Sequence, residues 1–154
     1  WRRMGFSDVV AIFLAMDSSV ELFKGGVVPL EEFVRMPYDN DILVRLIVKK
    51  RPGAFAYQAV RKQRTDLPTL NCAAAKVGEE YRVVVGSRPA RAMLLRDERG
   101  ILAGGITEES AAAFADYVAG VVRVSGNMWG SAEYRRALVP VLVRRTLLAL
   151  GEVR

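Results

Sequence analysis

The character of the sequence changes at Gly104 and Gly105, and this change constrains the fold more than any other feature. Upstream, short segments that are rich in β-branched residues or alternate between apolar and polar positions predict strands. These segments are residues 20–23, 42–49, 55–60, 80–86 and 90–96. Downstream, apolar residues recur at helical spacing, and Thr107 and Ser131 are typical N-caps of two helices. Strands followed by helices favour the α+β class, with an antiparallel sheet and two C-terminal helices packed on one face.

The first part of the chain mixes helical and strand signals. Ser7 is a favoured N-cap, and Asp8 places a negative charge in the first turn, so a helix is predicted over residues 8–16. Gly25 and Gly26 are expected to end the strand that precedes them. A short helical turn is predicted to begin at Pro29.

Residues 70–77 contain the small-residue run Ala73, Ala74 and Ala75. Their spacing fits a strand or a helix equally well, so both alternatives stay open.

The last helix is predicted to start after Ser131 and to be kinked by Pro140. Its predicted buried face consists of Tyr134, Ala137, Leu138, Val141, Leu142 and Ala149. Arg135 and Arg136 lie in its first turn, where positive charge opposes the helix dipole. This misfit predicts a nearby acidic partner, such as Glu133 or a carboxylate of the sheet.

The composition excludes several kinds of catalysis. The chain has no His and one Cys, Cys72. Ser-His-Asp and Cys-His mechanisms, His-bearing zinc sites and iron–sulfur clusters therefore have no ligands or bases within this chain. A lone Cys forms no internal disulfide, so a reducing compartment, the cytoplasm, is expected.

The chain carries a net charge of +6 and a pI near 9.8, which raises the question of nucleic-acid binding. The basic residues are, however, spread along the chain, and the densest group, residues 61–64, lacks interleaved aromatic residues. A solvated basic surface is therefore the preferred interpretation. No apolar run approaches the roughly 20 residues that span a bilayer.

No motif in the chain identifies an active centre. Gly25–Gly26 and Gly104–Gly105 fit neither the dinucleotide fingerprint nor the P-loop. Glu31–Glu32, Glu79–Glu80 and Glu108–Glu109 are adjacent pairs, and neighbouring residues on a helix do not converge on one point. We assign no catalytic residue and no metal ligand.

Six segments, taken in order, resemble the motifs of one protein family. They are Ser7–Asp8 followed by LAMDSSVEL (14–22), VPLEEF (28–33), DIL (41–43), Tyr57 with Arg61, Arg64 and Asp66, RPARA (88–92) and GSAEYRR (130–136). This order is similar to that of the FAD-binding subunits of molybdenum hydroxylases, the xanthine dehydrogenase and carbon monoxide dehydrogenase family. The last segment matches most sharply, as the motif that opens the family's last helix.

The resemblance implies two units. Residues 1–50 would be the C-terminal part of an α/β FAD-binding domain, and residues 51–154 a domain like the C-terminal domain of CO dehydrogenase flavoproteins. The family's Gly-rich loops for the FAD pyrophosphate lie upstream, so most of the FAD site is expected outside this chain. The chain begins at Trp1 rather than Met, and we expect a piece of a longer protein that is inactive alone.

Three positions carry over from the resemblance as cofactor-binding residues. Asp8 matches an aspartate on the flavin side of FAD, although a first-turn helix charge explains it equally well. Leu43 matches an apolar residue near the isoalloxazine, and an ordinary strand residue looks the same. Where the family often has a Lys near the flavin, this chain has Gln58 and Ala59. A neutral Gln58 supplies no positive charge to a reduced flavin, and Lys62 is the suggested substitute.

By the same resemblance, electrons leave a molybdenum centre, cross iron–sulfur clusters to FAD and reach NAD or another acceptor. The implied partners are a molybdenum-cofactor subunit and an iron–sulfur subunit in a cytoplasmic, xanthine dehydrogenase-like hetero-oligomer, with neither nucleic acid nor membrane. Arg88, Arg91 and residues 134–136 are candidate docking residues, and exposed surface is the preferred alternative. The alternative function is a stand-alone basic α+β module that binds nucleic acid or an acidic protein.

Overall fold

The computed structural model describes residues 7–37 and 40–153. Its elements are α1 (Asp8–Ala15), β1 (Ser19–Leu22), β2 (Gly26–Pro29), α2 (Leu30–Phe33), β3 (Leu43–Ile47), β4 (Ala54–Val60), β5 (Leu70–Val77), β6 (Glu80–Gly86), β7 (Met93–Arg96), α3 (Glu108–Val121) and α4 (Ala132–Glu152). All of the paired strands run antiparallel. The predicted α+β class, with two C-terminal helices on one face of an antiparallel sheet, is confirmed.

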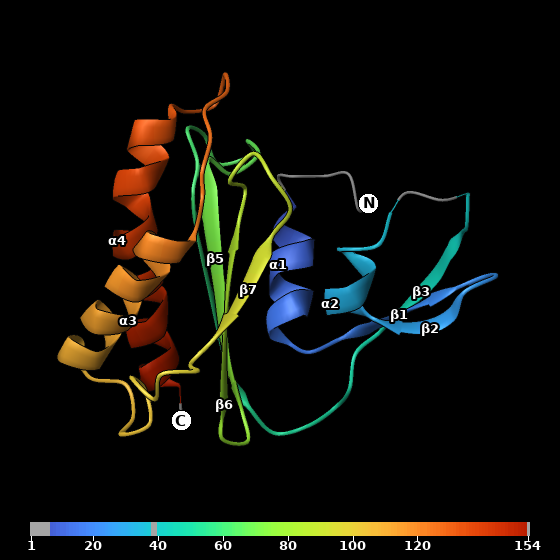
Figure 1. Cartoon of the computed structure of the whole chain (residues 1–154), viewed down its shortest axis with the longest axis horizontal. Coiled ribbons are helices and arrows are strands. Elements are labelled where there is room, and N and C mark those ends of the chain that lie inside the picture. Colours follow the sequence, from blue (N-terminus) through green and yellow to red (C-terminus); the bar gives the residue numbers. More distant parts are fainter. Residues whose placement is uncertain (1–6, 38–39, 154) are drawn as a thin grey trace.

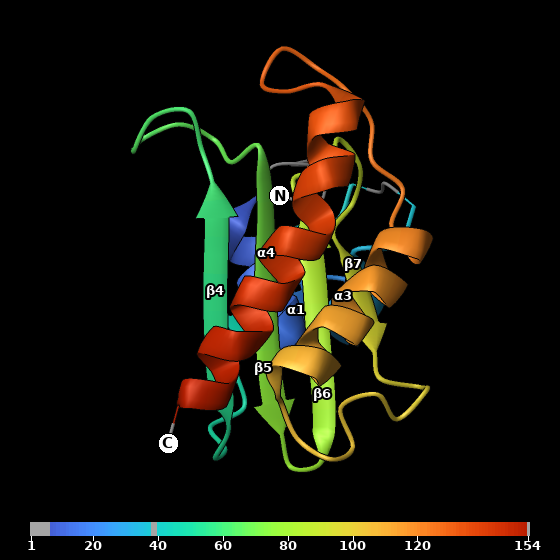
Figure 2. The same ribbon diagram turned by 90° about the vertical axis from the view of Figure 1, so that its left-hand side faces the viewer.

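A four-stranded sheet forms the centre of the molecule, in the order β4-β5-β6-β7. Helices α3 and α4 cover one face, and α1 packs on β5 and β6 from the other (Figures 1 and 2). The sheet therefore has a separate apolar core on each side.

The segment 70–77, which the sequence left open between strand and helix, forms strand β5. Leu70, Cys72 and Ala74 point into the core beneath α3 and α4, whereas Ala73 and Ala75 point towards α1. Because both faces are covered, the strand is apolar without a clear alternation, which is why its spacing did not distinguish it from a helix.

A smaller sheet, in the order β2-β1-β3, lies beside α1 and α2 (Figure 1). Val20 and Leu22 of β1 are buried in the core that includes both helices. Strand β1 ends at Leu22, shortly before the glycine pair, but the sequence analysis missed that the chain returns at once and that Gly26 opens β2. Gly26 has a φ of +66°, a left-handed conformation that Gly adopts without strain.

Asp17 connects the two halves of the chain. Its carboxylate accepts a hydrogen bond from Arg51 at 2.7 Å and forms ion pairs with Lys49 at 3.6 Å and Arg82 at 3.5 Å. Partial burial raises the pKa of Asp17, but these cations outweigh burial and the net pKa is lowered. The side chain of Arg82 on β6 is nearly fully buried, so this cluster ties the end of α1 to the main sheet.

The predicted buried face of α4 was largely wrong. Tyr134, Ala137 and Val141 are exposed, and of the predicted set only Leu142 is fully buried. The actual buried stripe contains Arg135, Val139, Leu142, Val143, Thr146, Leu147 and Leu150. The predicted face was chosen from apolar residues alone, so it could not include Arg135 and Thr146. It therefore lay on the wrong side of the helix. Helix α4 continues as one helix past Pro140.

Within the part of the chain that the structure describes, no helix combines the length and the apolar character that crossing a bilayer requires.

Candidate functional site between α1 and β4

The start of α1 is fixed by its cap. The Ser7 hydroxyl accepts a hydrogen bond from the Val10 amide at 3.1 Å, as the sequence predicted. This cap holds Asp8 in the first turn, where the helix dipole favours a carboxylate.

Two side chains of the main sheet and one from the segment that follows β4 converge on Asp8. The Tyr57 hydroxyl and the Asn71 amide both donate to Oδ1, the latter at 3.1 Å. Arg61, just after β4, contacts Oδ2 with its Nη2 at 2.9 Å. Since an ionised carboxylate has about four acceptor positions, Oδ2 keeps room for one more donor.

The network holds Asp8 ionised. Partial burial raises the pKa of Asp8, but the hydrogen bonds from Tyr57, Arg61 and Asn71 outweigh burial and lower the net pKa. Burial and the neighbouring carboxylate raise the pKa of Tyr57. At neutral pH, Asp8 is therefore an acceptor and Tyr57 a donor.

Asn71 is the polar centre of this arrangement. It is fully buried, and its amide also donates to the Ser7 carbonyl at 3.4 Å. A Cβ on the neighbouring Gly86 would lie 2.3 Å from Asn71 Oδ1, so only Gly leaves room for the amide.

An apolar crevice of about 120 Å³ lies beside Tyr57. It is lined by Ile12, Ala15, Met16, Phe55, Ala56, Tyr57, Ala73 and Ala74. Strand β4 is an edge strand, and α1 packs over β5 and β6 instead of over β4. As a result, Phe55 and Tyr57 face a half-open apolar surface with the charged Asp8 network near it.

The residues predicted for the cofactor site do not all lie close together in the structure. Gln58 lies on the opposite side of the sheet from Asp8, where its amide donates to the Arg145 carbonyl of α4 at 3.4 Å. Leu43 is partly exposed on β3 of the small sheet. Lys62, the suggested substitute cation, donates to the Met128 carbonyl at 3.3 Å and not to Asp8.

Sequence reasoning missed Asn71 and the role of Arg61 in this network. Asn71 had a visible signal, because it is the only polar residue before Lys76 in an otherwise apolar strand. Arg61 had none beyond its place in the quoted motif, since its contact with Asp8 joins residues far apart in the sequence.

The prediction for Arg135 was wrong. Its side chain is fully buried and donates to the carbonyls of Thr69, Ser125 and Gly130 and to Asn127 Oδ1, at 2.6–2.8 Å. Its partners are thus loop acceptors and not a carboxylate. Burial lowers the pKa of Arg135.

Two further candidate docking arginines, Arg88 and Arg91, donate to backbone carbonyls. Arg88 donates to the Arg91 and Arg123 carbonyls at 2.8 and 2.7 Å. Arg91 donates to the Arg35 carbonyl at 3.0 Å.

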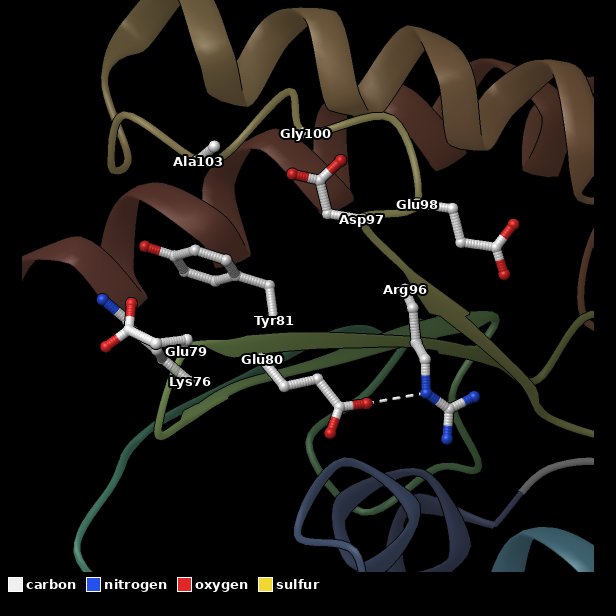
Figure 3. A pocket seen from close by; sticks show the side chains of 9 residues that line it. All are labelled: Lys76, Glu79, Glu80, Tyr81, Arg96, Asp97, Glu98, Gly100 and Ala103. Atoms are coloured by element: carbon white, nitrogen blue, oxygen red, sulfur yellow. Dashed lines mark hydrogen bonds and ion pairs between the residues drawn. The ribbon is translucent and has the colours of Figure 1, made fainter.

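A larger, more polar cleft of about 460 Å³ opens at the other end of the sheet (Figure 3). Three of its six charged side chains are held by hydrogen bonds: Glu80 accepts from Arg96 at 2.6 Å, and Asp97 accepts from the Ile101 and Leu102 amides. Among residues 7–37 and 40–153, no group of acidic, Cys or His side chains is suited to a metal ion. The cleft offers no converging reactive groups, so the α1–β4 surface is the stronger candidate.

Comparisons with known proteins agree with this architecture. Residues 55–150 match the family model of the CO dehydrogenase flavoprotein C-terminal domain. No curated protein matches the chain in sequence.

Several solved structures share the fold. The chain superposes with a TM-score of 0.78 on carbon monoxide dehydrogenase from Hydrogenophaga pseudoflava, at 23% identity, covering 97% of this chain and 57% of that one. Quinoline 2-oxidoreductase from Pseudomonas putida 86 gives 0.78 at 15% identity, with 98% and 58% covered. Reconstituted CO dehydrogenase from Oligotropha carboxidovorans gives 0.77 at 16%, with 96% and 57% covered. The chain thus spans little more than half the length of these relatives. Because the family model covers well over half of this chain, the chain belongs to the family of CO dehydrogenase flavoprotein C-terminal domains, as its motif order implied.

Proposed function

We propose that the chain is part of the FAD-binding subunit of a molybdenum hydroxylase and that its α1–β4 surface contributes to the flavin side of the FAD site. The observation that carries the proposal is the Asp8 network, because it is built around the residue that the family resemblance implies for the flavin side. Family membership and the shared fold support it.

The residues on this surface fit the chemistry of a flavin. An isoalloxazine presents apolar ring atoms and an N–H donor, and the surface offers a half-open apolar crevice and a carboxylate with a remaining acceptor position. Asp8 would accept a hydrogen bond from the cofactor, and the ring of Tyr57 would help to exclude water. Leu43 is a further proposed apolar contact. The side chain of Gln58 lies across the sheet, so the proposal does not depend on it.

FAD supplies the redox chemistry when bound, and this chain's residues position it. The chain has no Gly-rich pyrophosphate loop, so other parts of the subunit would hold the phosphates. The proposed subunit accepts electrons from iron–sulfur clusters and passes them to NAD or another acceptor. It works beside molybdenum-cofactor and iron–sulfur subunits, in the cytoplasm. We retain residues 1–50 and 51–154 as the proposed domain division.

The test is the FAD content of the intact parent subunit, measured by its visible spectrum after purification. We expect about one FAD per wild-type subunit and a clear loss of FAD with Asp8→Asn. Asp116→Asn is the matched control, because it removes the same charge from an exposed position on α3. A wild-type subunit that holds no FAD would overturn the proposal, and salt-sensitive nucleic-acid binding in its place would favour the basic-module alternative.

A further inference from the structure

The geometry points to Arg61 as the positioning residue of the proposed flavin site: we infer that it orients Asp8 and Tyr57 and places a compensating positive charge on the α1 side of β4. This inference rests on the function proposed above and assigns a role that neither Gln58 nor Lys62 fills.

The pleat of β4 decides which side chains reach this surface. Residues alternate between faces along a strand, and Tyr57 and Ala59 share the α1 side, opposite Ala73 and Asn71 of β5. Gln58 points to α4. The family's lysine corresponds to Gln58 or Ala59 in this chain. Of these two, Ala59 lies on the Asp8 side, and its side chain has neither a charge nor a hydrogen-bonding group.

Arg61, just after the end of β4, supplies the positive charge that Ala59 lacks. Its guanidinium makes three contacts: Nη2 lies 2.9 Å from Asp8 Oδ2 and 3.4 Å from the Tyr57 hydroxyl, and Nη1 donates to the Asp66 carbonyl at 2.9 Å. The backbone contact anchors the group, so the two remaining contacts fix Asp8 and Tyr57 relative to each other. Such a planar, multiply bonded arrangement is one that Arg makes and Lys does not.

The charges give Arg61 a second effect. Asp8 alone would place a negative charge beside the cofactor. Taking up two electrons and one proton makes a flavin one unit more negative, so an uncompensated Asp8 would oppose reduction. Arg61 makes the local pair neutral. Among the described residues, Arg61 is the cation that contacts Asp8.

The chain itself permits a first test without cofactor. The titration of the Asp8 carboxyl group is followed by NMR in wild type, Arg61→Gln and Lys62→Gln. We expect Arg61→Gln to raise the pKa of Asp8 and Lys62→Gln to leave it unchanged, because Lys62 bonds to the Met128 carbonyl instead. An unchanged Asp8 pKa in Arg61→Gln overturns the inference.

The second test measures the midpoint potential of FAD in the intact subunit, titrated with dithionite. We expect Arg61→Gln to weaken binding of reduced relative to oxidised FAD by about tenfold, which is a shift of about 30 mV to more negative potential for a two-electron couple. Lys62→Gln removes the same charge one residue away and should cause no such shift. Arg61→Lys should restore most of the potential but less of the FAD affinity.

The outcomes separate the two proposals. Equal shifts in Arg61→Gln and Lys62→Gln overturn the inference, since net charge alone would then explain them. FAD bound with an unshifted potential in Arg61→Gln overturns the inference but leaves the proposed function standing. A wild-type subunit without FAD overturns the proposed function. If Arg61→Gln does not fold, an Arg61→Lys variant with wild-type FAD affinity overturns the positioning role.

Discussion

The two faces of the main sheet use different chemistry. Beneath α3 and α4, β5 and β6 present the apolar side chains Leu70, Cys72, Ala74, Tyr81, Val83 and Val85. On the α1 side, the same strands present small residues together with two buried polar ones, Asn71 and Arg82. The α3–α4 face of these strands therefore contributes apolar burial, whereas their α1 face also holds polar and charged groups in place.

This difference explains where a functional site can form. A polar side chain in a fully covered core needs partners within the protein. On the α1 face, Asn71 and Arg82 have partners at the two ends of α1, Asp8 and Asp17. On this side, within the described part of the chain, the edge strand β4 has no helix over it, which leaves the Asp8 network open to a ligand.

The largest expected effect lies on the apolar face. Phe114 of α3 is fully buried and packs edge-to-face on Tyr117. Phe114→Ala should lower the free energy of unfolding by about 3–5 kcal/mol, through lost burial and the cavity left behind. Urea denaturation measures the loss. The Asp8 titration should be unaffected while the protein remains folded, and a changed Asp8 pKa would show that the faces are not independent.

Arg135 is a buried charged residue on the otherwise largely apolar α4 side. Arg135→Met keeps much of the side-chain volume but removes four hydrogen bonds and leaves the buried Thr69 carbonyl without the Arg135 donor. We expect a loss of about 3 kcal/mol, since each unsatisfied buried group costs about 1–3 kcal/mol. Arg136→Met, at the exposed neighbouring position, is the control and should change stability little. Equal losses in the two variants would contradict the buried network.

Gly86 tests the steric demand of the polar face. Gly86→Ala places a Cβ against Asn71 Oδ1 and should destabilise the protein by about 1–3 kcal/mol. It should also disturb the Asp8 titration, because Asn71 donates to Asp8. Gly120→Ala is the opposite control: it meets no atom within 4 Å and lies in α3, so a gain of about 1 kcal/mol is expected. Thermal unfolding of both variants measures the expected loss and the expected gain in stability.

The smallest expected effect depends on pH. The pKa of Asp8 in the folded protein is lowered from its usual 3.8. A carboxyl group of this kind stabilises the fold above its unfolded pKa, and the contribution is lost as the pH falls through the folded pKa. Asp8→Asn should thus cost about 1–2 kcal/mol at pH 7 and progressively less below about pH 4. Asp116→Asn, which removes the same charge from an exposed position on α3, is the control at pH 7 and should change stability little in parallel denaturation curves.

Local patterns in the sequence predicted most of the elements. The helix caps Ser7, Thr107 and Ser131 all accept the predicted backbone hydrogen bonds, because capping depends on neighbouring residues. The failures depend on contacts between distant segments. The buried face of α4 includes Arg135, whose partners lie in the loop after α3 and at Thr69.

The candidate site was predictable only in part. Asp8 follows from the cap and the family resemblance, but its partners come from β4, β5 and the segment that follows β4. Which of Gln58 and Ala59 faces Asp8 depends on the register of β4 with β5, which no local pattern fixes.

The close approach of Asn71 to Gly86 also has an evolutionary consequence. A larger residue at position 86 is acceptable only when position 71 loses its amide, and an amide at position 71 requires Gly at position 86. Either change carries a cost when it occurs alone. The residues at positions 71 and 86 should therefore covary among relatives. Lineages that have lost the pair should also differ at position 8, because the amide that steadies the carboxylate is then missing.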